Sequence, residues 1–136
     1  MDAVGIAQRL ASVRDSVASA TRQAGRDADA VRLIAVSKTH PESAIEAAYA
    51  AGQRDFGESY AQELTRKAEA LSHLDIRWHF IGRIQTNKAS LIAPVSHRVH
   101  AVHSARHARA LAARADHPVP CLSVREPGMQ AANSLR

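Results

Sequence analysis

The sequence is poor in the features that mark secreted and membrane proteins. Cys121 is the single cysteine among 136 residues, so the chain cannot form an internal disulfide and fits a reducing compartment. It has no apolar run of about 18 residues, which predicts that no segment spans a membrane. The first residues lack the basic and apolar regions of a secretory signal. We therefore expect a soluble, cytoplasmic protein.

Aromatic residues are also scarce, at 4% of the sequence, although the net charge is +5. The arginines are scattered among acids and alanines along expected helix faces, and few aromatic rings could stack on bases. We therefore expect no nucleic-acid partner. No cysteine or carboxylate stands at ligand spacing beside the clustered histidines, so we expect no metal site. These histidines are His97, His100, His103 and His107.

Strand-like and helix-like patterns alternate along the chain. Ile6, Leu10, Val13 and Val17 recur at helical spacing and predict one amphipathic helix over the first two dozen residues. Strands are expected at 31–36, 53–57, 76–81, 98–102 and 119–124, and further helices at 41–51, 61–74, 87–92 and 104–115. This alternation predicts a parallel α/β sheet, either doubly wound or barrel-like. No glycine-rich nucleotide motif follows the first strand.

Lys38 directly follows the buried-looking strand run at 33–36, in the string Ser37-Lys38-Thr39. Active sites of α/β barrels are built at the carboxyl ends of the strands, which is where this lysine is expected. Partial burial there would lower the pKa of the amine and increase its neutral, nucleophilic fraction, as Schiff-base chemistry requires. The alternative is an ordinary exposed loop lysine.

Two further strings follow expected strands, GESYAQE at 57–63 and WHFIGRIQTNK at 78–88. Together with Ser37-Lys38-Thr39, in this order and spacing, they resemble the pyridoxal phosphate homeostasis proteins, which are also described as alanine-racemase N-terminal-domain-like. The third string matches the family signature at every fixed position. The resemblance runs from about residue 33 to residue 121.

The resemblance implies a TIM-type (β/α) barrel with pyridoxal 5'-phosphate (PLP) at the carboxyl ends of its strands. It implies that Lys38 is the lysine that forms the aldimine with PLP. Ser59 stands where the family commonly has asparagine beside the cofactor, and it reaches less far. His79 and Gly82 correspond to the family's third strand near the cofactor, so the implied cofactor-binding residues are Lys38, Ser59, His79 and Gly82.

Simpler interpretations of several of these residues stay open. His79 would serve equally well as a hydrogen-bonded histidine of the core. Glu58 could pair with Arg83 or Lys88 in a solvated loop. Lys67 is expected on a helix surface and Lys88 at a helix start, which leaves Lys38 as the only lysine expected to react with PLP.

The length predicts only part of a barrel, because a closed (β/α)8 barrel takes about 250 residues. We expect residues 1–122 to form the N-terminal half of a PLP-binding, alanine racemase-like barrel, with two open strand edges that favour pairing with another chain. Residues 123–136 do not resemble the family and are expected to be a non-native or disordered tail. The resemblance itself implies a monomer.

The resemblance implies a PLP-binding protein of vitamin B6 homeostasis that carries PLP as a lysine aldimine without catalysis of its own. A PLP-dependent racemase-like enzyme is the first alternative, although racemases need a second base from an added domain. A nonfunctional truncated product is the second alternative.

Overall fold

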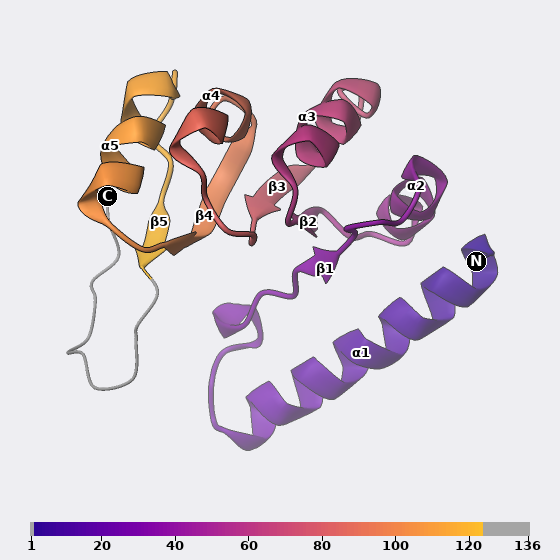
Figure 1. Cartoon of the computed structure of the whole chain (residues 1–136). Coiled ribbons are helices and arrows are strands. Elements are labelled where there is room, and N and C mark those ends of the chain that lie inside the picture. The colour runs from indigo at the N-terminus through magenta and orange to yellow at the C-terminus, as the bar shows by residue number, and fades with distance from the viewer. Residues whose placement is uncertain (1, 124–136) are drawn as a thin grey trace.

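The computed structural model describes residues 2–123, which form an α/β fold around a five-stranded parallel sheet (Figure 1). The strands are β1 (Ala35–Val36), β2 (Asp55–Glu58), β3 (Arg77–Phe80), β4 (Ser96–Val102) and β5 (Cys121–Ser123). The predicted α/β class with a parallel sheet and flanking helices is confirmed. The tail predicted at residues 123–136 lies outside the described residues, apart from Ser123.

Each strand pairs with the strand that precedes it in the chain, giving the order β1-β2-β3-β4-β5. A doubly wound sheet reverses its strand order at a switch point, and the described strands show no such reversal. The consecutive order is that of a barrel wall, as expected for part of a TIM-type barrel. Within residues 2–123, β1 and β5 are the two edges of this sheet.

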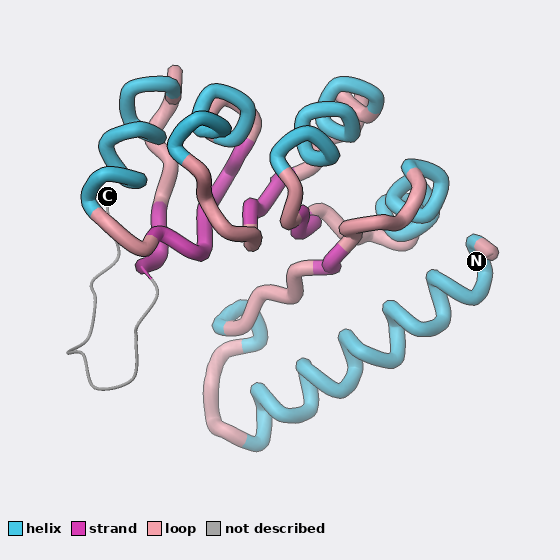
Figure 2. The backbone as a smooth tube through the Cα atoms, in the orientation of Figure 1, coloured by secondary structure: helices cyan, strands magenta, loops and turns pink. Residues whose placement is uncertain are grey.

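In Figure 2 the four shorter helices lie on one side of the strands, and the long first helix is drawn across the strands from them and contacts the second helix. The α-helices are α1 (Ala3–Gln23), α2 (Glu42–Ala50), α3 (Ala61–Ala70), α4 (Ala89–Ile92) and α5 (Ala105–Arg114), with 3-10 turns η1 (Ala28–Ala30) and η2 (Thr86–Lys88). Side-chain caps begin two of them, because Asp2 accepts from the Gly5 N–H and Ser104 accepts from the His107 N–H. No helix among residues 2–123 combines the length and the hydropathy needed to cross a bilayer.

The core lies between the helices and the facing side of the sheet. Phe56 and Phe80 alternate with residues of the opposite sheet face, and each is only 1% exposed. They belong to one buried cluster with helical residues that include Ile45 and Leu64. Full burial of an apolar side chain of this size contributes about 1.5–3 kcal/mol. This packing fixes which residues point to the other, concave face.

Several elements are shorter than the sequence pattern suggests. The first strand, expected at 31–36, has only Ala35 and Val36 in the sheet, because the ladder to β2 begins at the Ala35–Phe56 pair. The helix expected at 61–74 ends at Ala70, where Leu71 caps it. The helix expected at 87–92 begins as the 3-10 turn η2 and becomes α4 at Ala89. The order of the elements nevertheless agrees with the prediction throughout.

Candidate functional site

Three of the four predicted site residues, Lys38, Ser59 and Gly82, lie at the carboxyl edge of the sheet. Ser59 directly follows β2, while Lys38 and Gly82 stand two residues after β1 and β3. Backbone hydrogen bonds of 2.9 Å extend the ladders to this point, from the Ser37 N–H to the Gly57 carbonyl and from the Ile81 N–H to the Glu58 carbonyl. The three residues therefore begin the loops of neighbouring strands.

Lys38 is exposed and lies in the turn that leads from β1 to α2. The prediction that it is partly buried is wrong, because the preceding residue, Ser37, turns inward and Lys38 turns outward. None of the ion pairs among residues 2–123 involves the Lys38 amine. The amine is therefore accessible to a ligand approaching this edge.

Gly82 and Ser59 bring the loops after β2 and β3 into close contact. A Cβ atom added at Gly82 would stand 2.0 Å from the Ser59 carbonyl oxygen, so only glycine fits here without a backbone shift. A hollow of about 390 Å³ lies beside this contact, and its lining includes Ser59, Gly82, Arg83 and Lys88. Lys38 is not part of that lining. The structure thus joins Ser59 and Gly82 directly and places Lys38 in the turn that follows the adjacent strand, β1.

A second lysine, Lys67 of α3, lies fully buried beneath the turn that carries Lys38. The expectation that Lys67 faces solvent is wrong, since its exposed fraction is 0%. Its Nζ atom lies 2.7 Å from the Ser37 carbonyl oxygen, 2.8 Å from Glu58 Oε1 and 2.7 Å from Glu63 Oε1. The Ser37 hydroxyl donates to Glu58 Oε2 at 2.7 Å. Glu58 therefore pairs with Lys67, and not with Arg83 or Lys88, which the sequence had left open as partners.

The two carboxyl groups around Lys67 have opposite pKa shifts. Burial raises the pKa of Glu58, although hydrogen bonds from Lys67 and Ser37 oppose that effect. Burial also acts to raise the pKa of Glu63, but hydrogen bonds from Lys67 and from the Thr39 N–H outweigh it and lower that pKa. Glu63 is thus the carboxylate that holds its negative charge more firmly beside the Lys67 ammonium.

The spacing along α3 carries a signal for the burial of Lys67. Leu64, Lys67 and Leu71 follow one another at intervals of three and four, which places them on one helix face. Leu64 and Leu71 are 0% and 2% exposed, so a residue between them on that face is buried as well. Glu63 stands four residues before Lys67, at a distance suited to an ion pair within a helix.

His79, the fourth predicted site residue, lies away from the other three, on the concave face of the sheet. It is 1% exposed, and both ring nitrogens have partners, Asp55 Oδ1 at 2.8 Å from Nε2 and His100 Nε2 at 2.9 Å from Nδ1. Arg77 completes this network with two hydrogen bonds to the Asp55 carboxylate, of 3.0 and 2.8 Å. His79 is therefore a hydrogen-bonded histidine of the interior.

Burial and pairing set the charges in this concave-face network. Burial acts to raise the pKa of Asp55, but hydrogen bonds from Arg77 and His79 prevail and lower it to about 2. Burial lowers the pKa of His79 and also that of His100. Asp55 is thus a firmly ionised carboxylate beside neutral imidazoles at pH 7. Among residues 2–123, no group of histidine, cysteine or acidic side chains has the arrangement of a metal site.

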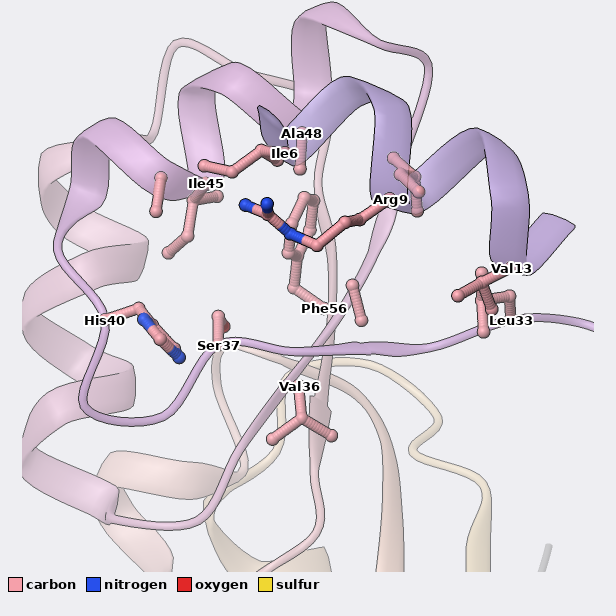
Figure 3. A pocket seen from close by; sticks show the side chains of 13 residues that line it. Ile6, Arg9, Val13, Leu33, Val36, Ser37, His40, Ile45, Ala48 and Phe56 are labelled. Carbon is pink, nitrogen blue, oxygen red and sulfur yellow. The ribbon is translucent and has the colours of Figure 1, made fainter. Parts of the chain in front are cut away.

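A second hollow, of about 290 Å³, lies between α1, α2 and β1 (Figure 3). Its lining is mostly apolar and includes Ile6, Ile45 and Phe56. Figure 3 shows the side chains of Ser37 and Val36 on opposite sides of the β1 backbone. Ser37 faces this hollow, whereas Lys38 does not line it. Its polar lining residues are Arg9, Ser37 and His40, which Figure 3 labels.

Comparison with known proteins shows strong similarity to one group. The chain is 44% identical over 119 residues to the pyridoxal phosphate homeostasis protein of Pseudomonas aeruginosa, covering 88% of this chain and 52% of that protein. It is 47% identical over 91 residues to the protein of the same name from Escherichia coli, covering 65% of this chain and 39% of that protein. The chain therefore spans about half the length, or less, of these curated relatives. No protein-family model matches it.

Solved structures show the same partial correspondence. PipY of Synechococcus elongatus, with PLP bound, is 43% identical and superposes with a TM-score of 0.66, over 78% of this chain and 46% of PipY. An unknown protein from Bifidobacterium adolescentis is 35% identical, with a TM-score of 0.77, over 84% of this chain and 52% of that protein. Sequence and fold agree, and the resemblance inferred from the three strings is confirmed.

Proposed function

We propose that this homologue of the pyridoxal phosphate homeostasis proteins binds PLP covalently through Lys38 and serves vitamin B6 homeostasis. The single observation that carries the proposal is the position of Lys38, an accessible amine at the carboxyl edge of a parallel α/β sheet. The relative PipY has been solved with PLP bound, and it shares 43% of its aligned sequence with this chain.

The residues at this edge fit the chemistry of PLP. When bound, the cofactor would supply an aldehyde that could condense with a lysine amine, with loss of one water. Lys38 provides the amine. Ser59, which directly follows the neighbouring strand β2, offers a hydroxyl and a backbone amide, and Gly82 lets the loops after β2 and β3 approach each other without a side chain between them. Arg83 and Lys88, which line the same hollow as Ser59 and Gly82, would supply positive charge to a phosphate ester bound there.

The contacts that we propose for PLP are Lys38, Ser59 and Gly82, without His79. Both nitrogens of His79 are engaged in the concave-face network, so a cofactor contact would break a buried hydrogen bond. We further propose that residues 1–122 correspond to one half of a barrel of the relatives' kind. The consecutive strand order and the coverage of 52% of the Pseudomonas protein support this correspondence.

We propose a carrier role without catalysis, because the names of the relatives describe homeostasis of the cofactor and not a reaction. Lys38 is an accessible lysine at this edge, and a racemase would also require a base on the opposite side of the substrate. Alanine incubated with the chain and PLP should therefore racemise no faster than with the Lys38→Ala variant.

The direct test is borohydride reduction of the chain in the presence of PLP, followed by peptide mapping. We expect the label on the peptide that contains Lys38 and no label there in Lys38→Ala. Lys88→Ala serves as the matched control, because it removes a cation near the same edge but leaves Lys38 in place. Labelling centred on Lys67 or Lys88 in the original chain would refute the assignment.

A further inference from the structure

The turn that carries Lys38 is held from both sides by one buried charged cluster. On the amino side, the Ser37 carbonyl accepts from the Lys67 ammonium and the Ser37 hydroxyl donates to Glu58. On the carboxyl side, the Thr39 N–H donates to Glu63 Oε1, the same atom that pairs with Lys67. Both neighbours of Lys38 in the chain are therefore fixed, whereas Lys38 itself is exposed.

The backbone of this turn needs such support. Thr39 has a φ of +66°. Among residues 2–123 it is the only residue other than glycine with a positive φ. A β-branched residue is strained in this left-handed region and stays there only when surrounding contacts hold it. The hydrogen bond from the Thr39 N–H to Glu63 is the contact that acts directly at that residue.

Lys67 is the centre of the cluster. It is the only cation that contacts Glu58, Glu63 and the Ser37 carbonyl among the described residues, and it is completely buried. Burying an ammonium is costly unless it is paired and hydrogen bonded, which here requires both carboxylates and the carbonyl together. Removing the ammonium leaves the buried Glu58 carboxyl and the partly buried Glu63 carboxyl close together without a counter-ion, so they are expected to separate and release the turn.

We propose that Lys67 is a positioning residue for Lys38, acting through Glu63 and Ser37 to hold the 37–39 turn in the conformation that presents the Lys38 amine at the carboxyl edge. Lys67 does not itself touch the cofactor in this account. The inference rests on the proposed function of Lys38, but the conformation of the turn can be measured without PLP.

The first measurement is amide hydrogen exchange of the Thr39 N–H in the 136-residue chain without cofactor. Lys67→Met removes the charge at nearly constant size. Glu63→Ala removes the acceptor of the Thr39 N–H from a position that is only partly buried. Thr39 exchange can therefore still be measured in Glu63→Ala if Lys67→Met folds poorly. We expect both variants to speed Thr39 exchange by about tenfold or more, the factor for one charge-assisted hydrogen bond. The Ile81 N–H, which donates to the Glu58 carbonyl within the sheet, should exchange as before.

The matched control is Arg66→Met. Arg66 is the neighbour of Lys67 on α3, but its ion pair with Glu42 is on the surface, so Thr39 exchange should stay unchanged in Arg66→Met.

The second measurement is the rate of PLP attachment to Lys38, which should fall by about tenfold in Lys67→Met and in Glu63→Ala. The double variant should be no slower than Lys67→Met, because the two residues act through one path.

Unchanged Thr39 exchange in both variants would overturn the inference, as would attachment to Lys38 at the original rate when exchange has increased. The inference would also be overturned if the effects of the two substitutions on the rate of PLP attachment added fully in the double variant, because two independent structural losses would add in that way. If the unaltered chain never attaches PLP at Lys38, the proposed function fails, while Thr39 exchange still decides whether Lys67 holds the turn.

Discussion

Replacing Asp55 with asparagine tests the charge of the concave-face network. The substitution keeps the size of the side chain and one acceptor oxygen, but it removes the negative charge that Arg77 and His79 face. Asp55 has an ordinary pKa of 3.8, and its neighbours lower that to about 2 in the folded chain. At about 1.4 kcal/mol for each pKa unit, the ionised form stabilises the fold by about 2.5 kcal/mol.

The sign of the pH dependence follows from the lowered pKa. The unfolded chain binds a proton at Asp55 more readily than the folded chain, so the stabilisation is complete well above pH 3.8 and is lost as the pH falls towards 2. Asp55→Asn should therefore lower the free energy of unfolding by about 2.5 kcal/mol at pH 7. The difference between the two proteins should shrink to roughly half of this at about pH 3 and nearly disappear at about pH 2.

Urea unfolding followed by fluorescence provides the assay, because Trp78 is the only tryptophan of the chain and is 6% exposed. Asp116→Asn is the control. Asp116 has a lowered pKa through its hydrogen bond from His117, but both side chains are exposed, so little change in stability is expected. If the free energies of unfolding of the original chain and Asp55→Asn differ by the same amount at pH 7 and pH 3, the electrostatic account is refuted.

One further substitution and one chemical probe test local packing. Gly82→Ala should lower the free energy of unfolding by about 1–3 kcal/mol, because the new Cβ would stand 2.0 Å from the Ser59 carbonyl oxygen, and an unchanged urea midpoint would contradict this. Burial raises the pKa of the Cys121 thiol, so a thiolate-specific disulfide reagent should react about tenfold or more slowly with the folded chain than with the unfolded chain at pH 7. Equal rates would show that this thiol is accessible.

The order and type of the elements were predictable because they depend on local patterns. Apolar residues at helical spacing in α1 and the cap at Ser104 are visible without any partner. The bounds of β1 were not predictable, since residues 31–34 have a strand-like composition but no ladder partner in β2. Whether an apolar residue joins a strand depends on the neighbouring strand, which lies about twenty residues further along the chain.

The candidate site was predictable only in part for a related reason. The position of Lys38 at a strand end follows from the local sequence, but its exposure depends on which way the turn after Ser37 runs. The pairing of His79 with Asp55 depends on the register between β2 and β3, which aligns Gly57 with His79 and brings the Asp55 side chain within reach. Such partners are set by tertiary structure, and no spacing along the chain reveals them.

The neighbour-to-neighbour order of the strands also governs how the chain can fold. Residues paired across the sheet are separated by between 18 positions, for Trp78 and Ser96, and 22 positions, for Asp55 and Arg77. Each strand pairs with a strand that is close to it in the sequence, so the loss of conformational entropy on loop closure is divided into small, similar steps. Folding of such a sheet can begin with β1, α2 and β2 and extend one strand at a time, in the direction in which the ribosome releases the chain.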